Sequence, residues 1–330
     1  MYVTMDKYID RFREQLIEAL GIGEQISEIN TGRPITNILI SGMGGSGIGG
    51  AIVQEFVADK LNVPVLIVND YDLPAYAAEN TLFICCSYSG NTEETLSTFH
   101  QALEKKCFVV CITTGGKLKE LGEINNFPTV IIPGGMPPRT CLGYSLVAQL
   151  YVLFKVGLIE DDFITQIKRA ADLLLKLEEE IKITAKSTAE KIKDTIPIIY
   201  SSAPMQNVGL RLKQQINENA KMHCFANVIP EMNHNELVAY YERNNNLSVI
   251  YLRDKSASDQ INKRFDLCAE LIQPKVLVME EFYAEGTTHF EKVLYLVHLG
   301  DWLSYYLSEL KSVDAIKIHS LDWLKTELEN

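Results

Sequence analysis

Short apolar runs alternate with longer amphipathic stretches along the first half of the chain. A run that is apolar at every position is typical of a strand buried on both faces of a parallel sheet. Helices are expected between these runs, one ending near Asp59 and another starting near Thr92. The pattern predicts an α/β doubly wound fold. Its strands are expected at residues 37–41, 65–68, 81–86, 107–112 and 130–132.

The second half repeats this alternation more weakly. A charged helical stretch, residues 161–193, is predicted to connect two lobes, and its segment 177–183 (LEEEIKI) is interpreted as a solvated helix face. We therefore expect two doubly wound α/β lobes with parallel sheets flanked by helices, over residues 1–155 and 156–330. The remaining elements are predicted as strands at 196–200, 247–252 and 276–279 and as helices at 288–310 and from 320 onward.

Composition and charge narrow the class of protein. The 330 residues are 47% hydrophobic and 22% charged, as in an ordinary globular protein of about two domains. Lys and Arg total 31 against 43 Asp and Glu, a formal charge of −12. Nucleic acids and anionic membranes call for basic surface, so both are poor candidates as partners.

The N-terminal residues and the cysteines indicate in which cellular compartment the protein is expected. The first sixteen residues carry charges every few positions, where a signal peptide needs an apolar stretch, and no window approaches a membrane span. The seven cysteines contain no CxxC pair and are interpreted as reduced core residues. We expect a cytoplasmic protein.

A glycine-rich segment, Gly42–Gly47 (GMGGSG), follows the first strand and precedes a helix. Glycines there permit a tight turn and close approach of a ligand to the helix N-terminus. The spacing also satisfies G-x-G-x-x-G, and Asp70 closes the next strand, so an NAD-dependent dehydrogenase is an open alternative. A turn that serves only packing is the other alternative.

A hydroxyl-rich segment follows the third strand and opens a helix. Ser87, Ser89 and Thr92, together with backbone N–H groups at the helix start, would form a largely neutral cage for a phosphate monoester. A pyrophosphate on the glycine turn would not require this second cradle. The alternative is an ordinary helix start, capped by Ser89, Asn91 or Thr92.

With these motifs the chain resembles the sugar isomerase (SIS) phosphosugar-binding proteins, and among them the bifunctional phosphoglucose/phosphomannose isomerases. The resemblance extends over nearly the whole chain, and the two segments downstream of residue 210 are its most specific part. The matching segments are SGMGGSG at 41–47, SYSGNTEET at 87–95, TTGGKL at 113–118, PPR at 137–139, NENAK at 217–221 and PEMNHNE at 230–236.

Two further residues have side chains suited to proton transfer. Glu218 lies among amides near a predicted helix end, where a partly desolvated carboxylate can take a proton from carbon. His234 lies in a polar turn. Taken alone, the first is more often an exposed helix carboxylate and the second more often a structural histidine.

The resemblance assigns roles to these residues. It implies reversible conversion of glucose 6-phosphate, and of mannose 6-phosphate, to fructose 6-phosphate through a cis-enediol, in a site between the lobes. Glu218 is then the base at C1 and C2, His234 assists ring opening, and Arg139 supports the enediolate charge. The substrate is held by Gly45, Ser46, Ser87, Ser89 and Thr92. No residue cluster has metal-ligand spacing, so neither a metal nor a cofactor is expected.

The resemblance also covers the C-terminus and the assembly. It implies a lysine that reaches the substrate, best matched by Lys325, with Lys317 as the alternative. Ile318 stands where some relatives carry a threonine thought to accommodate both C2 epimers, which weakens the expectation of dual substrate use. A homodimer with a shared active site, His234 coming from the partner, is implied as well. A non-catalytic phosphosugar-binding regulator and an isomerase of another sugar phosphate, such as an amino-sugar phosphate, stay open.

Overall fold

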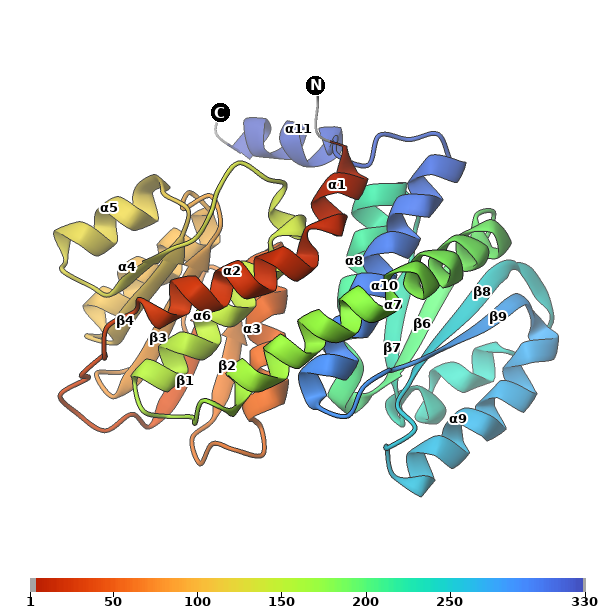
Figure 1. The fold of residues 1–330 in the computed structure, drawn as a ribbon, viewed down its shortest axis with the longest axis horizontal. Coiled ribbons are helices and arrows are strands. Elements are labelled where there is room, and N and C mark those ends of the chain that lie inside the picture. Colours follow the sequence, from red (N-terminus) through yellow and green to blue (C-terminus); the bar gives the residue numbers. More distant parts are fainter. Residues whose placement is uncertain (1–3, 329–330) are drawn as a thin grey trace. The chain divides into compact units, whose positions relative to one another are not determined.

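The computed structural model describes residues 4–328, and these divide into two units along the chain (Figure 1). The N-terminal unit is Arg11–Ala171. The C-terminal unit runs from Asp172 onward and also includes helix α1 (Met5–Asp10). The change from one unit to the other falls within the long helix α7 (Asp162–Ile192), whereas the boundary expected from the sequence lies before this helix, after residue 155, with all of residues 1–155 in the first lobe.

The N-terminal unit contains a five-stranded sheet in the order β2-β1-β3-β4-β5, with every neighbouring pair parallel. Its strands confirm the five predicted from apolar runs: β1 (Asn37–Ser41), β2 (Val65–Val68), β3 (Thr81–Ser87), β4 (Phe108–Thr113) and β5 (Thr129–Ile131). Its helices are α2 (Phe12–Glu24), α3 (Gly44–Val57), α4 (Glu93–Glu104), α5 (Gly116–Ile124) and α6 (Leu142–Lys155).

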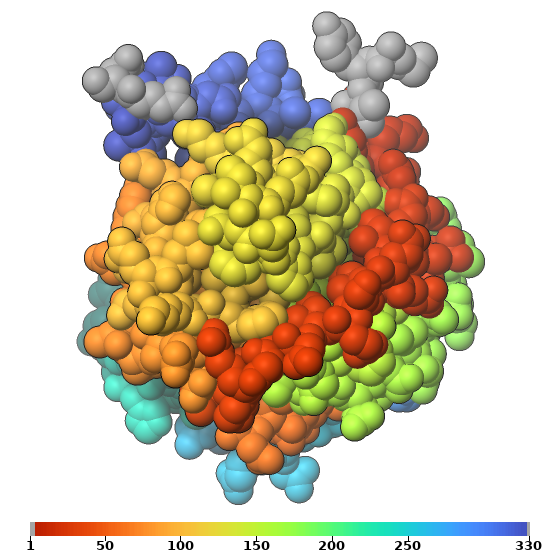
Figure 2. Space-filling model, turned by 90° about the vertical axis from the view of Figure 1, so that its left-hand side faces the viewer, coloured from red at the N-terminus to blue at the C-terminus, as the bar shows by residue number. Residues whose placement is uncertain are grey.

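Alternate residues of β3 show that the sheet is covered on both faces. Phe83 and Cys85 belong to a buried cluster with Phe99 of α4. The neighbouring Cys86 points the other way and accepts a hydrogen bond from Gln149 of α6 at 3.7 Å. Since helices cover both faces, the predicted doubly wound fold is confirmed. In the space-filling view α2 forms a red ridge along the surface of this unit (Figure 2).

The C-terminal unit contains a second parallel sheet in the order β7-β6-β8-β9. Three of its strands were predicted, and β7 (Phe225–Ile229) was missed. This edge strand carries few buried side chains: Ile229 is buried, whereas Phe225 is exposed, so no continuous apolar run marks it. The remaining elements are β6 (Ile196–Ser202), β8 (Asn244–Arg253), β9 (Val276–Tyr283), α8 (Gln206–Ala220), α9 (Asp259–Ile272), α10 (His289–Leu310) and α11 (His319–Leu328). Within residues 4–328 no helix combines the length and apolar character that crossing a membrane requires.

Helix α8 is locked against α10 by a buried ladder of polar contacts. Arg211 Nη2 donates to both oxygens of the Asp301 carboxylate, at 2.7 and 3.0 Å, and Gln215 donates to the same carboxylate at 2.8 Å. One turn further on, Asn219 donates to Ser304 at 2.9 Å. Charged groups buried at this depth are costly unless they are paired, so the ladder fixes the rotation and register of α8.

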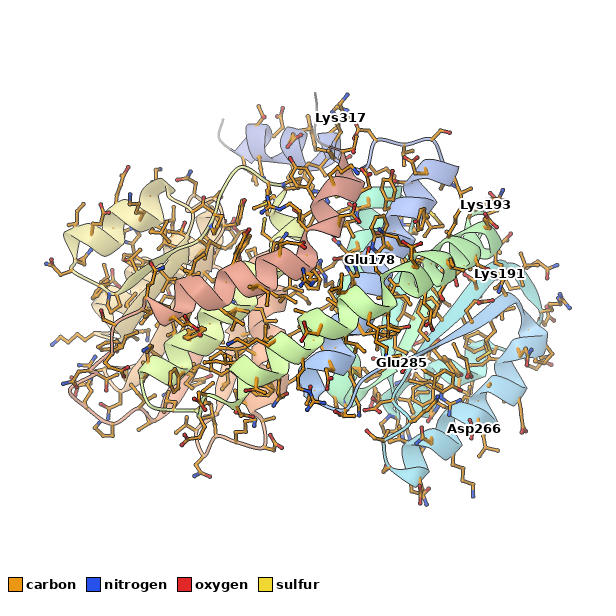
Figure 3. All side chains as sticks on the ribbon, in the orientation of Figure 1. Glu178, Lys191, Lys193, Asp266, Glu285 and Lys317 are labelled. Atoms are coloured by element: carbon orange, nitrogen blue, oxygen red, sulfur yellow. The ribbon has the colours of Figure 1, made fainter. Side chains whose placement is uncertain are left out.

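The segment predicted as a solvated face of α7 is only partly so. Glu178 is half-buried, and its carboxylate contacts the buried His298 of α10 at 3.3 Å and Lys182 at 2.7 Å (Figure 3). The prediction was wrong for this residue because its partner His298 lies 120 positions away in the sequence. Burial, the largest influence, raises the pKa of Glu178, but the contacts with His298 and Lys182 outweigh it and lower the pKa to about 2.

This lowered pKa predicts an acid-sensitive contribution to stability. A carboxyl whose pKa is lower in the folded state stabilises the fold above its ordinary value of 4.5 and loses that contribution as the pH falls towards 2. We expect the free energy of unfolding to fall between pH 6 and pH 3, and this fall to be about 1 kcal/mol smaller in Glu178→Gln than in the parent protein. The difference is no larger because solvent screens the partly exposed pair. Urea denaturation at a series of pH values measures it. The neighbouring exposed Glu179→Gln is the control, and parallel pH curves for all three proteins would contradict the prediction.

Candidate active site

The glycine turn lies at the carboxyl end of β1. Helix α3 already begins at Gly44, so most of the glycines form its first turns. A Cβ on Gly42 would lie 2.8 Å from the carbonyl oxygen of Cys86, and one on Gly47 would lie 2.6 Å from the carbonyl oxygen of Gly42. That carbonyl accepts a hydrogen bond from Asn69 Nδ2 at 2.5 Å. Close backbone approach therefore requires glycine at both positions.

The hydroxyl-rich turn lies at the end of β3. Ser87 Oγ is 2.8 Å from Thr92 Oγ1 and accepts a hydrogen bond from the Gly90 N–H at 3.1 Å, and Ser89 Oγ accepts one from the Asn91 N–H at 3.2 Å. Thr92 occupies the N-cap position of α4, but its side chain makes no capping hydrogen bond. The geometry thus differs from an ordinary capped helix start and gathers hydroxyls beside the first N–H groups of α4.

A second turn, residues 113–118, was not among the predicted site residues and is joined to the first by hydrogen bonds. The N–H of Thr114 donates to the Tyr88 carbonyl at 3.1 Å, and the N–H of Leu118 donates to the Gly90 carbonyl at 2.9 Å. The N–H of Lys117, in the first turn of α5, donates to the Asn91 side chain at 3.0 Å. The glycine pair in TTGGKL was the available signal.

The Pro/Gly loop that leads to Arg139 joins the same edge of the sheet. The N–H of Met136 donates to the hydroxyl of Tyr88 at 3.1 Å, and burial raises the pKa of Tyr88, which keeps that hydroxyl protonated. A Cβ on Gly45 would lie 3.0 Å from the Pro138 carbonyl oxygen and 3.7 Å from Arg139 Cα. Arg139, on the short helix η1 (Pro138–Thr140), is buried.

One edge of the N-terminal sheet therefore brings together the predicted residues of that half. Parallel strands place the ends of β1, β3 and β4 side by side, and the turns described above follow those ends. Hydroxyls, helix N–H groups and one buried guanidinium are donors suited to an anion. The residues brought to this edge are Gly45, Ser46, Ser87, Ser89, Thr92 and Arg139.

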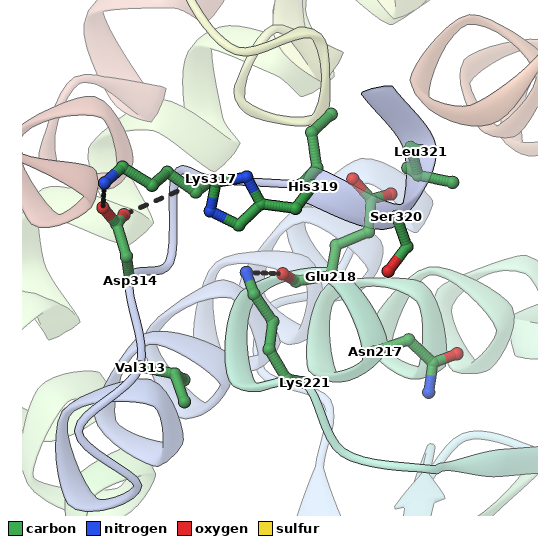
Figure 4. A pocket seen from close by; sticks show the side chains of 10 residues that line it. Asn217, Glu218, Lys221, Val313, Asp314, Lys317, His319, Ser320 and Leu321 are labelled. Carbon is green, nitrogen blue, oxygen red and sulfur yellow. Dashed lines mark hydrogen bonds and ion pairs between the residues drawn. The ribbon is translucent and has the colours of Figure 1, made fainter. Parts of the chain in front are cut away.

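In the C-terminal unit, Glu218 lines a cavity of about 630 Å³ (Figure 4). Glu218 is half-buried near the end of α8, the helix that the polar ladder locks. Lys221 ends this helix in the left-handed conformation, with φ 56°, and its Nζ donates to the Glu218 backbone carbonyl at 2.5 Å. The cavity is lined by Asn217, Glu218, Lys221, Val313, Asp314, Lys317, Ile318, His319, Ser320 and Leu321.

Acidic and basic groups are balanced around this cavity. Lys317 Nζ lies 3.8 Å from Asp314 Oδ2. The Ile316 N–H, which donates to the Asp314 carboxylate at 2.9 Å, lowers the pKa of Asp314 and keeps it ionised. Lys317 and Ile318 both line the cavity, whereas Lys325 lies on the exposed face of α11 and is not one of its lining residues. Of the two candidate lysines, Lys317 and not Lys325 therefore lines the same cavity as Glu218, with its Nζ directed towards Asp314.

His234 is placed apart from this cavity. It is the last residue of the short helix η3 (Glu231–His234), its side chain is exposed, and it does not line the Glu218 cavity. Glu218 and Lys317 therefore line one cavity, and His234 is not among the residues that line it.

Comparison with known proteins identifies the family. Residues 181–328 match the bacterial phospho-glucose isomerase C-terminal SIS domain. The chain is 38% identical to a bifunctional phosphoglucose/phosphomannose isomerase of Caldicellulosiruptor bescii, over 96% of both chains, and 33% identical to one of Aquifex aeolicus, over 90% of this chain and 91% of the relative. A solved structure of a putative phosphosugar isomerase from Clostridium difficile 630 shares the fold, with a TM-score of 0.78 at 14% identity over 96% of this chain and 95% of the other. The chain therefore belongs to the bifunctional phosphoglucose/phosphomannose isomerases of the SIS phosphosugar-binding family.

Proposed function

We propose that this protein is an aldose–ketose isomerase that interconverts glucose 6-phosphate and mannose 6-phosphate with fructose 6-phosphate. The observation that carries the proposal is that a chain 38% identical to such an isomerase over 96% of its length contains both a phosphate-type cradle and a cavity-lining glutamate. The regulator alternative gains no support from these relatives, which are enzymes by name.

The proposed phosphate site is the turn at residues 87–92. The Ser87, Ser89 and Thr92 hydroxyls and the first N–H groups of α4 would donate to phosphate oxygens, with Gly45 and Ser46 at the start of α3 completing the site. These donors are uncharged, so an acidic protein can bind a phosphate monoester here without a cluster of basic side chains.

The proposed chemistry moves two hydrogens within the substrate, one from C2 to C1 and one from the C2 hydroxyl to O1. His234 assists opening of the sugar ring. Glu218 removes the proton from C2 of the open-chain aldose while O1 takes up a proton, which gives the cis-enediol. The same carboxyl then returns its proton to C1 while the C2 hydroxyl loses its proton, and the product is the ketose. Arg139 stabilises the negative charge that develops on oxygen. The reaction has no net oxidation, so its balance requires no external oxidant or reductant.

We also propose a homodimer with a shared active site and a cytoplasmic location. The first is supported only by the family resemblance. The second is supported by the seven cysteines, all of them free and buried, which fit a reducing compartment.

A substrate panel tests the proposed function. We expect turnover of glucose 6-phosphate and mannose 6-phosphate to fructose 6-phosphate in assays coupled to the ketose product, and no binding of NAD by calorimetry. Ile318 lines the Glu218 cavity, so Ile318→Thr is expected to change the ratio of the two aldose rates. Binding of fructose 6-phosphate without turnover of either aldose would favour the regulator. Turnover of an amino-sugar phosphate alone would favour the other isomerase.

A further inference from the structure

The turn that carries His234 is anchored on its N-terminal side. Met232 is fully buried in the core of the C-terminal unit. Asn233 donates from Nδ2 to Cys268 Sγ at 3.0 Å and accepts at Oδ1 from Arg264 Nη1 at 3.1 Å. Both partners lie on α9, so the residue before His234 is fixed to that helix.

The same turn is anchored on its C-terminal side by one carboxylate. Glu236, the first residue of the short helix η4 (Glu236–Ala239), accepts the Tyr200 hydroxyl at Oε1 and the Asn227 side-chain amide at Oε2, each at 2.6 Å. Tyr200 lies on β6 and Asn227 on the adjacent β7. Glu236 thus ties the residues just after His234 to two neighbouring strands.

The Tyr200 hydroxyl takes part in two hydrogen bonds, and the donor of each can be assigned. The Tyr200 oxygen is also 2.8 Å from the Tyr240 hydroxyl. A phenol has one proton, and Tyr200 uses it towards Glu236, so Tyr240 must be the donor to Tyr200. Burial raises the pKa of Tyr240 to about 12 and raises that of Tyr200 further. Both phenols therefore keep their protons at any pH at which an enzyme of this kind works.

We propose that Tyr200 is a positioning residue for His234. By donating to Glu236, its hydroxyl fixes the backbone of residues 233–236 and with it the direction in which the exposed imidazole is presented. This inference rests on the proposed role of His234 in ring opening. A purely structural role for the hydroxyl is the competing explanation, and it predicts a loss of stability with no dependence on His234.

A neighbouring tyrosine provides a matched control. Tyr251, on β8, is fully buried in the same cluster, and its ring lies 6.1 Å from that of Tyr200. Among the described residues, the Tyr251 hydroxyl has no hydrogen-bond partner. Tyr200→Phe and Tyr251→Phe therefore delete the same atom from the same core, but only the first deletion removes a contact to Glu236.

The test is a double-mutant cycle on the full-length protein. Isomerisation of glucose 6-phosphate is measured for Tyr200→Phe, Tyr251→Phe, His234→Ala and the Tyr200→Phe/His234→Ala pair, with thermal unfolding of each. We expect Tyr200→Phe to lower kcat about tenfold with little change in KM, because small misplacements of a catalytic group are costly. In the His234→Ala background the same substitution is expected to change kcat by less than about twofold. Tyr251→Phe is expected to leave kcat unchanged.

Each other outcome overturns the inference. An unchanged kcat for Tyr200→Phe, an equal loss in Tyr251→Phe, or a loss that persists in the His234→Ala background would show that the hydroxyl does not act through His234. If Tyr200→Phe fails to fold, Asn227→Ala removes the other contact to Glu236 and takes its place in the cycle. Full activity of His234→Ala would overturn the proposed role of His234 and this inference together, and a loss in His234→Ala alone would overturn only the inference.

Discussion

Glu218→Gln is expected to lower the isomerisation rate at saturating substrate by at least about a hundredfold, the scale of general-base catalysis. The amide has nearly the same shape as the carboxyl and keeps the side chain at the cavity, but it cannot accept the C2 proton. The polar ladder of α8 does not include the Glu218 side chain, so the helix is expected to keep its place. Exchange of the C2 hydrogen of glucose 6-phosphate with D2O, followed by proton NMR, measures the step directly.

The control for this substitution is an exposed carboxylate on another helix. Glu190→Gln, on α7, removes the same charge without touching the cavity and is expected to leave the rate unchanged. Fructose 6-phosphate is expected to bind Glu218→Gln with near-normal affinity. Retention of more than about a tenth of the parent rate would rule out Glu218 as the general base.

Gly90→Ala is expected to raise the dissociation constant for fructose 6-phosphate at least about tenfold, and to lower kcat/KM by about a hundredfold, because the phosphate turn must move. Gly90 has φ +70°, and an added Cβ would overlap the Gly115 carbonyl oxygen. Neither backbone can yield without breaking the hydrogen bonds that join the two turns. Calorimetric titration measures the affinity, and circular dichroism checks the fold.

A second glycine separates the clash from the backbone strain. Gly135 also has a positive φ, +84°, but an added Cβ there would meet no atom within 4 Å. Gly135→Ala therefore carries the conformational penalty alone, about 1–2 kcal/mol, and is expected to leave the affinity for fructose 6-phosphate within about threefold of the parent. If Gly90→Ala and Gly135→Ala bound fructose 6-phosphate with equal affinity, the turn at residues 113–118 would not hold the phosphate turn rigidly.

The sheet of the N-terminal unit could be predicted because its strands are buried on both faces and therefore read as continuous apolar runs. The start of α10 was predictable for a similar local reason, since Thr288 and Glu291 form a capping box next to it. Strand β7 has the opposite character: it lies at a sheet edge, and its exposed Phe225 leaves no periodic signal.

The candidate site also has a part that local sequence predicts and a part that it does not. Ser87 and Thr92 lie on one turn between a strand and a helix, so their proximity follows from local sequence. Contacts between distant segments could not be predicted, because no local pattern encodes the pairing of Glu178 with His298 or of Asn91 with the start of α5. Which of Lys317 and Lys325 lines the Glu218 cavity could not be predicted, since both are exposed lysines and differ only in their tertiary position.

The interlocked turns at residues 87–91 and 113–118 also constrain how this protein can change over evolution. N–H groups of the turn at 113–118 donate to two carbonyls and one side-chain oxygen of the turn at 87–91, so an insertion or deletion in either turn would leave these donors and acceptors unpaired. The lengths of the two turns can vary only together. We therefore expect relatives with other sugar specificities to differ in the side chains around the Glu218 cavity. The turn that would hold the phosphate is expected to stay the same in all of them.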